Sequence, residues 1–590
     1  MTGSPAAIPG LAPTRLTHGA VALDASILLA ITLTLTTWFA AWPPALPPAL
    51  PGGALAVAGF LRFRGAVRPR PPRPETLVCL ALAVLLRLPA LVHPWAWVNR
   101  DGAYGAFVAH FLLEGGRPAP IFTEGAHYQG TLKGHLAALL SLLLRVSDLS
   151  WLMVAASVTL HLVFVASTMA LARRVGGRWA ALAAGLYLAL SPRFLTIFSL
   201  NCTGQYLDVL ALGGVALALL ARVLDENLSR PQARWPYFAI GWLAGAAFWQ
   251  QPVALSYVAV ALLVLALRSS TWRDPWTLLA LAGLAVGVMP VVLWNVQNDW
   301  ASLGVVTRQS GTFLEQVRAL PSLAGRTVAV SFPILGGLTS RPEAHLPGLR
   351  PLVSTLFPVV FFAYLALRGR DIASSLGRGR PSASLLPPLL FLAALLLQWL
   401  QPAAGAYSRP RYLLPVLAGA AVMLGVVLAR AAARSRTLAG VALALLLALN
   451  VTGSLPRLRQ SPEIEAHFRH LVRAVEEKGI RTGYADFTIS APVTMFTGER
   501  IVLSPRLGPT PAHESDRHAL RVDGDGPDAY ILRGDEDPER FAAVLRSLGV
   551  SYRLDTDPVP IFYGFSRRVR LEEVIDFRGP VTDSAESAED

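Results

Sequence analysis

The chain is 590 residues long; hydrophobic residues make up 53% of it and charged residues 15%. This composition excludes an ordinary soluble enzyme and is typical of a protein with many membrane spans. The formal net charge of +14 would suit a nucleic-acid partner. However, the arginines lie in short loops between apolar runs, a pattern that orients membrane proteins. Cys79 and Cys202 belong to separate apolar regions, so no disulfide framework is expected.

Apolar runs long enough for a membrane helix of about 20 residues recur along the chain. The first of them shows no small-residue cleavage site, so we expect a retained helix rather than a removed signal peptide. Some runs are short or interrupted by proline, which sets the expected total at about thirteen, give or take about two. The expected spans lie near 22–42, 46–62, 76–94, 150–172, 178–196, 205–223, 236–251, 253–268, 276–294, 351–367, 384–400, 412–430 and 437–453.

Clusters of arginine assign the two sides of the membrane. Six arginine-rich loops fall on one side, the cytoplasmic side, provided that segment 131–146 does not cross. That segment is short for a span, and we expect a helix lying along the membrane surface. The N-terminus is then cytoplasmic. The loops 95–149, 295–350 and 401–411 and the C-terminal region are then extracytoplasmic.

The composition becomes that of a soluble domain from about residue 456. Apolar residues recur at helical spacing over 463–478, and strand-like runs follow at 501–503 and 529–532. Asp537-Pro538 predicts a helix start, with a side-chain cap followed by proline at the first helical position. This region shows no metal spacing, phosphate loop or nucleophile motif, which favours binding or packing over catalysis.

The fold class expected from these patterns is a polytopic α-helical membrane protein with a small C-terminal extracytoplasmic α/β domain. Its expected parts are an N-terminal helical hairpin with a basic cytoplasmic loop (1–74), a transmembrane module (75–455) and the soluble α/β domain (456–590).

Asp101 lies just beyond an apolar run, in Val98-Asn99-Arg100-Asp101-Gly102-Ala103-Tyr104. Ionisable groups are costly near hydrocarbon, so a carboxylate at the lip of a span is a functional-site candidate. Its expected partner is Lys133. Only two of the 52 basic residues are lysines, and a lysine kept against that bias suggests a need for a compact ammonium. Chance retention is the alternative. Tyr104, in the same segment, is an expected substrate contact.

Polar residues between Asp101 and Lys133 are further candidates. Glu124, His127 and Tyr128 would shape a substrate pocket, and the alternative for each is a hydrated loop. No second His or Cys stands at ligand spacing near His127, so no zinc site is expected.

Residues at the ends of later spans complete the expected substrate contacts. Gln205, Tyr206 and Asp208 enter a span from the outer side, and Asn295 closes a span on the same side. Asp208 is the second candidate carboxylate, because an acid at this depth is costly unless it faces a cavity.

Arg409 and Arg411 stand in Tyr407-Ser408-Arg409-Pro410-Arg411-Tyr412, at the start of a late span. A guanidinium there would bind phosphate through two parallel hydrogen bonds. The alternative is an interfacial anchor whose arginine and tyrosine side chains reach the lipid head groups.

These residues together resemble the C-type fold (GT-C) membrane glycosyltransferases of the family 39 kind. This family includes the protein mannosyltransferases and the lipid A aminoarabinose transferase. The resemblance covers about residues 75–430 and rests on Asp101-Gly102-Ala103-Tyr104, Leu113-Glu114-Gly115-Gly116, Lys133-Gly134-His135, Leu190-Ser191-Pro192-Arg193-Phe194 and the pair Arg411-Tyr412.

The resemblance implies transfer of a hexosyl or pentosyl group from a polyprenyl phosphate carrier to an acceptor on the extracytoplasmic face. The acceptor would be an envelope glycan, a glycolipid or a protein. Asp101 would be the base, and Lys133 and Arg411, with Arg409, would hold the donor phosphate. Relatives often carry Asp-Glu where this chain has Asp101-Gly102, so the need for a divalent metal stays open. The bias towards arginine and alanine indicates a bacterial plasma membrane.

Two other classes of function stay open. A transporter or flippase for lipid-linked sugars would more often show internal repeats with interrupted helices and polar groups in mid-span. Here no repeat is evident and the polar groups gather in exterior loops, which favours an enzyme. A non-catalytic envelope scaffold would leave Asp101 and Lys133 dispensable.

Overall fold

The computed structural model describes the chain from residue 73 onward with interruptions, and the expected spans near 22–42 and 46–62 lie outside the described residues. Contacts between residues group Pro72–Asp590 into one compact unit. The described residues are 73–116, 120–225, 230–268, 275–302, 313–338, 349–400, 410–507, 516–534, 536–574 and 577.

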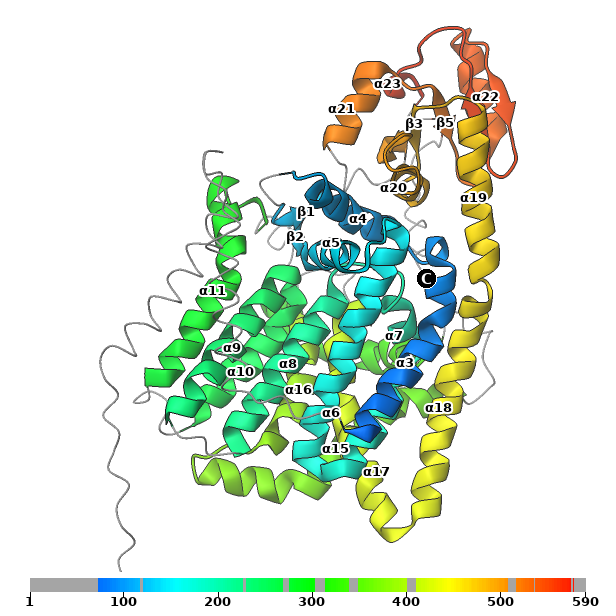
Figure 1. Ribbon diagram of the computed structural model, residues 1–590. Helices are drawn as coiled ribbons and strands as arrows, with labels where there is room; N and C mark the ends of the chain where they lie inside the picture. Colours follow the sequence, from blue (N-terminus) through cyan, green and yellow to red (C-terminus); the bar gives the residue numbers. More distant parts are fainter. Residues whose placement is uncertain are drawn as a thin grey trace, which may run out of the picture. The chain divides into compact units, whose positions relative to one another are not determined.

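Helices dominate the part of the unit that precedes the C-terminal sheet (Figure 1). Its α-helices, in chain order, are α3 (Pro74–Val92), α4 (Arg100–Leu113), α5 (Leu132–Leu144), α6 (Leu149–Ala189), α7 (Arg193–Phe198), α8 (Tyr206–Asp225), α9 (Arg230–Gln250), α10 (Leu255–Leu267), α11 (Pro275–Gln297), α13 (Phe313–Arg326), α14 (Phe332–Leu335), α15 (Leu349–Gly377), α16 (Leu386–Leu400), α17 (Leu414–Arg434) and α18 (Arg436–Arg459). Short 3-10 or π-helical turns are η1 (Pro94–Ala96), η2 (Pro252–Ala254), η4 (Thr327–Ser331), η6 (Ala383–Leu385) and η8 (Pro410–Leu413).

Within the described residues, eight helices are long and apolar enough to cross a membrane, judged by length and composition. The chain is therefore a multi-pass membrane protein, while the expected total of about thirteen spans stays a prediction. The expected pair 150–172 and 178–196 corresponds to α6, which consists of two helical segments joined by a kink at Gly177, where φ is 81° and ψ is −168° and the backbone is not helical. Glycine readily adopts a positive φ, so the chain can change direction there.

Small residues bring the helices of this bundle into close contact. Gly241 and Gly245 of α9 face Gly283 and Gly287 of α11, and a methyl group on Gly241 would collide with the Ala280 carbonyl. Such close approach of backbones is how membrane helices pack without a hydrophobic driving force between them. The main apolar core lies among α6, α8, α16 and α17.

The exterior loop expected over 95–149 is largely structured. It contains α4, a two-stranded hairpin of β1 (Phe122–Thr123) and β2 (Ala126–Gly130), and α5. Figure 1 shows these elements together at one end of the helical bundle. Helix α5 has 13 residues, too few for the about 20 that a span needs, and it exposes a row of leucines (Leu139, Leu142, Leu143 and Leu144). Both features fit the expected helix at the membrane surface.

The C-terminal region is a mixed α/β sheet with helices on both faces. Its elements are α19 (Ser461–Glu477), β3 (Thr482–Ala485), α20 (Phe487–Phe496), β4 (Val502–Ser504), η9 (Pro505–Leu507), α21 (Asp516–Asp525), β5 (Ala529–Ile531), α22 (Pro538–Ser547), β6 (Arg553–Asp555), β7 (Ile561–Tyr563) and α23 (Leu571–Val574). The strand order is β4-β3-β5-β7-β6. Strand β3 is parallel to β4 and β5, and β7 is antiparallel to β5 and β6.

Alternation along each strand separates the two faces of this sheet. Tyr530 packs on one face with Phe541 of α22, whereas its neighbour Ile531 packs on the other with Val475 of α19. The expected helix start at Asp537 is confirmed, because its carboxylate accepts a hydrogen bond from the Glu539 backbone N–H at 2.9 Å.

Candidate active site

Asp101 lies in the first turn of α4, which Asn99 caps by accepting a hydrogen bond from the Gly102 backbone N–H. The Asp101 carboxylate is held at both oxygens. Its Oδ2 accepts from the Gly204 backbone N–H at 2.9 Å, and its Oδ1 accepts from Arg100 Nε at 3.2 Å. The side chain is 12% exposed, so it is fixed in orientation and still open to a ligand.

The Gly204 donor belongs to the loop 199–205, which joins α7 to α8. The loop reverses sharply, with φ of 56° at Cys202 and 49° at Gly204. Asn99 Nδ2 also donates to Thr203 Oγ1 at 2.6 Å. The start of α4 and this loop therefore form one hydrogen-bonded unit around Asp101.

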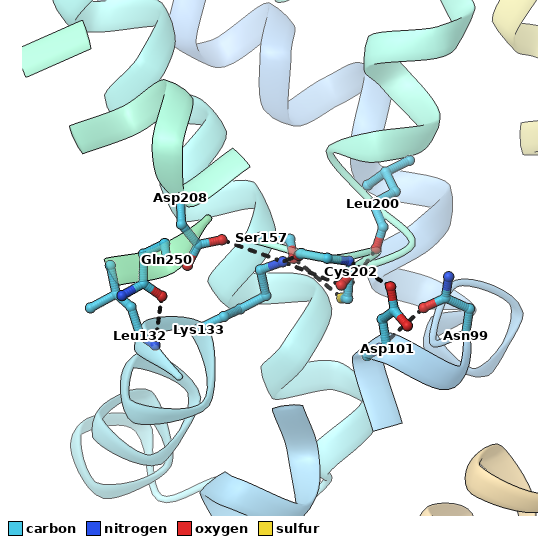
Figure 2. Close-up of polar contacts among 11 residues, drawn as sticks. Asn99, Asp101, Leu132, Lys133, Ser157, Leu200, Cys202, Asp208 and Gln250 are labelled. Carbon is cyan, nitrogen blue, oxygen red and sulfur yellow. Dashed lines mark hydrogen bonds and ion pairs between the residues drawn. The ribbon is translucent and has the colours of Figure 1, made fainter. Parts of the chain in front are cut away.

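Lys133 contacts the same loop from the other side. The expected pairing of Lys133 with Asp101 is wrong, because its carboxylate partner is Asp208. Its ammonium donates to the carbonyls of Cys202 and Gly204 at 3.3 and 2.9 Å, and it forms an ion pair with Asp208 at 3.5 Å. Figure 2 shows Lys133 between Asp208 and the loop, with Asp101 beyond it. Lys133 and Asp208 are both buried, at 1% and 0% exposure. The Gly204 backbone lies between Lys133 and Asp101, because its N–H donates to Asp101 and its carbonyl accepts from Lys133.

Gly102 packs directly against the loop that holds Asp101. A methyl group on Gly102 would lie 2.9 Å from Cys202 Cβ and 3.1 Å from Val98 Cγ1. A side chain at this position would therefore require α4 or the loop to shift, and glycine permits the observed close approach.

Aromatic and cationic residues from three other elements complete the surroundings of Asp101. The Arg411 guanidinium of η8 lies 5.6 Å from the Tyr412 ring, and Tyr412 meets the Tyr206 ring of α8 at 6.0 Å. Burial raises the pKa of the Tyr128 hydroxyl, Tyr412 and Asp101 raise it further, and Arg411 acts against them. Arg411, Tyr412 and Tyr206 thus follow one another in contact, and the charges of Asp101 and Arg411 both act on the Tyr128 hydroxyl. Arg409 lies outside the described residues.

The hairpin places its candidates differently. Glu124 lies in the turn between β1 and β2, and His127 is exposed with its ring 4.7 Å from Trp294 of α11. Tyr128 is half-buried, and the charge of Asp101 acts on its hydroxyl. Of the hairpin candidates, Tyr128 is therefore the one with an interaction that relates it to Asp101.

Three other candidates are buried. Tyr104 packs in an apolar cluster beside Phe107. Asn295 accepts from the Ser302 hydroxyl and backbone N–H and donates to the Val291 carbonyl, so it fixes the turn after α11. Gln205, at the end of the loop, is 2% exposed, and its side-chain oxygen finds no hydrogen-bond partner in the described part of the chain.

The sequence patterns missed two residues of the site. Gln250 Oε1 accepts from the Leu132 backbone N–H at 3.1 Å and so fixes the start of α5, next to Lys133. Its signal was the tight turn in Trp249-Gln250-Gln251-Pro252, where α9 ends and η2 begins. The second is Arg100, whose contact with Asp101 has no separate sequence signal because arginine is the usual cation of this chain.

No group of three or more His, Cys, Asp or Glu side chains that would hold a metal ion occurs among the residues that the structure describes. Of the two candidate carboxylates, Asp101 is partly exposed, whereas Asp208 is fully buried beside Lys133.

Comparison with solved structures identifies the fold. The chain is similar to ArnT from Cupriavidus metallidurans bound to undecaprenyl phosphate, with a TM-score of 0.50 and 13% identity over 82% of this chain and 97% of ArnT. The apo state of the same protein gives a TM-score of 0.49 at 15% identity, over 84% of this chain and 99% of that one. AglB from Archaeoglobus fulgidus, an oligosaccharyltransferase in complex with an inhibitory peptide and a dolichol-phosphate, gives 0.43 at 14% identity, over 83% and 74%.

No protein-family model and no curated protein matches the chain. The likeness to ArnT is one of fold, and the chain has the C-type (GT-C) membrane glycosyltransferase fold.

Proposed function

We propose that the chain is a membrane glycosyltransferase that moves a sugar from a polyprenyl-phosphate-linked donor to an acceptor on the extracytoplasmic face of a bacterial plasma membrane. The observation that carries the proposal is the Asp101 carboxylate, which is 12% exposed and is oriented by the Gly204 N–H and by Arg100. The fold shared with ArnT supports it, since ArnT was captured with undecaprenyl phosphate.

Asp101 is suited to act as the general base. Its oxygens are oriented by the Gly204 N–H and by Arg100, and a carboxylate oxygen offers two lone pairs, so it can accept from a protein donor and from an acceptor hydroxyl together. In the proposed reaction, the acceptor oxygen forms a bond to the anomeric carbon and gives its proton to Asp101. The bond from the anomeric carbon to the phosphate oxygen breaks, and the polyprenyl phosphate departs with the electron pair. A positioned base contributes about 10²–10⁴ in rate.

Arg411 is the cation that we assign to the departing phosphate, with Arg409 as its expected companion. A guanidinium binds phosphate through two parallel hydrogen bonds and stabilises the charge that develops on the leaving oxygen. Lys133 receives a different role. Its three donors already meet two carbonyls and Asp208 inside the protein, so it acts by holding the loop that orients Asp101.

The remaining candidates are assigned to sugar or acceptor contacts. Tyr128 lies in the Asp101 environment, and Glu124 and His127 lie on the same hairpin. Gln205 and Tyr206 approach the site from the start of α8. We give Tyr104, Asp208 and Asn295 supporting rather than contacting roles, because each is buried with protein partners.

The test is a membrane assay with radiolabelled polyprenyl phosphate sugars, which follows label into glycan, glycolipid and protein fractions and the release of lipid phosphate. Asp101→Asn should lower transfer by about 10²–10⁴ at equal folded protein. Asp148→Asn is the matched control. Asp148 is an exposed acid of the same exterior region that caps α6, and asparagine also serves as a cap.

Each outcome separates the candidate functions. Transfer by the wild type and the control, with loss in Asp101→Asn, supports the enzyme and identifies the sugar and acceptor. Movement of intact lipid-linked sugar across vesicles without release of lipid phosphate would favour a transporter. No transfer and no transport would favour a scaffold.

The proposed orientation needs its own test. Both native cysteines are buried, so single cysteines can be introduced at the exposed positions Arg370 and Glu477. An impermeant thiol reagent applied outside cells should label Glu477→Cys and spare Arg370→Cys. The reverse pattern would place Asp101 on the cytoplasmic side.

A further inference from the structure

Helix α20 of the C-terminal sheet region packs directly on the segment that carries Asp101. Its last residue, Phe496, stacks on Trp95 with ring centroids 4.1 Å apart. Ala491 and Met495 share an apolar cluster with Phe107 of α4. The C-terminal region is thus in contact with the helix of the proposed base.

Phe487, at the start of α20, contacts the neighbour of Asp101. The Arg100 guanidinium carbon lies 4.7 Å from the centre of the Phe487 ring, while Arg100 Nε lies 3.2 Å from Asp101 Oδ1. One arginine therefore touches both the proposed base and the C-terminal region. A planar guanidinium stacks on an aromatic face, which fixes a side chain that otherwise has many rotamers.

Local structure fixes the position of Phe487. The buried strand β3 ends at Ala485, and Asp486 then caps α20 by accepting hydrogen bonds from the Thr488 backbone N–H and hydroxyl at 2.9 and 2.7 Å. Phe487 follows this cap directly and is half-buried. A side chain at the junction of a buried strand and a capped helix has little freedom to move away from Arg100.

We propose that Phe487 is a positioning residue of the transfer reaction, and that through Arg100 the C-terminal region completes the site around Asp101. The inference rests on the proposed function. A cation held beside one carboxylate oxygen favours the ionised form, which is the form that accepts a proton. Without the Phe487 ring, Arg100 spends less time at Asp101, and a larger fraction of the base is protonated at low pH.

Other charged or titratable groups near Asp101 set the background of this effect. They are Arg411 and Tyr412 from η8, Tyr128 from β2 and Tyr206 from α8. None of these residues is altered in the Phe487 variants, so a shift of the acidic limb of the pH–rate profile reports on Arg100.

The experiment measures kcat/KM for label transfer against pH in the full-length protein. Arg100→Gln should lower kcat/KM on the acidic limb by about tenfold, and Phe487→Ala by about two- to fivefold. Phe487→Trp should restore the wild-type limb, since tryptophan offers the strongest aromatic face for a cation. The double variant Arg100→Gln with Phe487→Ala should fall no further than Arg100→Gln alone.

Phe496→Ala is the matched control, because it removes a phenyl ring from the same helix and the same contact region but contacts Trp95 rather than Arg100. It should keep the wild-type limb. An unchanged limb in Phe487→Ala, an equal shift in Phe496→Ala, or additive losses in the double variant would each overturn the inference.

A second measurement separates this inference from the proposed function. If the wild type transfers no sugar, the proposed function fails, and the contact is still tested by thermal stability in detergent. The losses in Tm from Arg100→Gln and Phe487→Ala should be less than additive in combination, whereas those from Arg100→Gln and Phe496→Ala should add. Additive losses in both pairs would overturn the inference by themselves.

Discussion

Asp101 and Asp208 lie on opposite sides of one short loop and differ in exposure and in the groups that contact them. Asp101 is 12% exposed and accepts hydrogen bonds at both oxygens. Asp208 is fully buried and paired with Lys133 at 3.5 Å. An acid available to substrate and an acid enclosed with a cation have different uses, so the first is suited to chemistry and the second to holding the loop between them.

The ion pair of Lys133 and Asp208 offers the largest effect on stability. Lys133→Met leaves a buried carboxylate without its cation, which should cost about 3–5 kcal/mol of folding free energy. Adding Asp208→Asn should recover most of that loss, because no buried charge then remains. The stability of both variants is measured by heating the protein in detergent and following the fraction that stays monodisperse. If Lys133→Met keeps the wild-type Tm and loses transfer, Lys133 would instead have the role first expected for it, which is to bind the donor phosphate.

Arg411 should show the largest effect on transfer after Asp101 itself. Arg411→Gln removes the proposed cation for the leaving phosphate, and kcat/KM should fall by about 10². Arg411→Lys should fall less, because it keeps the charge but loses the paired hydrogen bonds. Arg370→Gln, at an exposed arginine of α15, is the control and should transfer like the wild type. Equal rates in all three variants would leave Arg411 as an interfacial anchor.

Gly204 connects Asp101 to the ion pair of Lys133 and Asp208, because its N–H donates to Asp101 and its carbonyl accepts from Lys133. Its replacement should have a moderate effect on both stability and transfer rate. Gly204→Ala places a side chain at a φ of 49° and 2.8 Å from the Tyr206 ring. The left-handed conformation alone should cost about 1–2 kcal/mol, and the displaced N–H should weaken its hold on Asp101. Gly498→Ala has a similar φ of 58° with open space around it. This control should lose stability without losing transfer.

Replacement of Tyr128 should have the smallest effect on the transfer rate, and the pH dependence of that rate tests the role of its hydroxyl. Because burial raises the pKa of its hydroxyl, Tyr128 stays protonated and neutral through the alkaline range in which an unperturbed tyrosine, near about pH 10, begins to ionise. Tyr128→Phe should therefore leave the alkaline limb of the pH–rate profile unchanged. It should lower the rate by no more than about fivefold, the worth of one hydrogen bond of about 1 kcal/mol. Loss of an alkaline limb in this variant would show that the hydroxyl titrates.

Local sequence patterns predicted the parts of the fold that depend on neighbouring residues. Helical periodicity and length gave α5 and α19, and cap chemistry gave the start of α22 at Asp537. Asp101 stood out as a candidate because a charge beside an apolar run is rare. Each of these signals is contained in a few consecutive residues.

The partners of the site residues could not be predicted, because they come from distant segments. Lys133 meets Asp208 rather than Asp101 because the loop after α7 folds between them, and its course depends on left-handed conformations at Cys202 and Gly204. Phe487 belongs to α20 of the C-terminal region, whereas Arg100 begins α4, so their contact joins two segments far apart in the sequence. Contacts of this kind are set by tertiary packing, for which local patterns carry no signal.

The most direct measurement compares Asp101→Asn with the double variant Lys133→Met and Asp208→Asn in one membrane assay, with label transfer normalised to folded protein. Asp101→Asn should fold normally and lose transfer by about 10² or more. The double variant should keep transfer within about tenfold of the wild type. Normal transfer in Asp101→Asn, with transfer abolished in a well-folded double variant, would contradict the account and assign the chemistry to the buried pair.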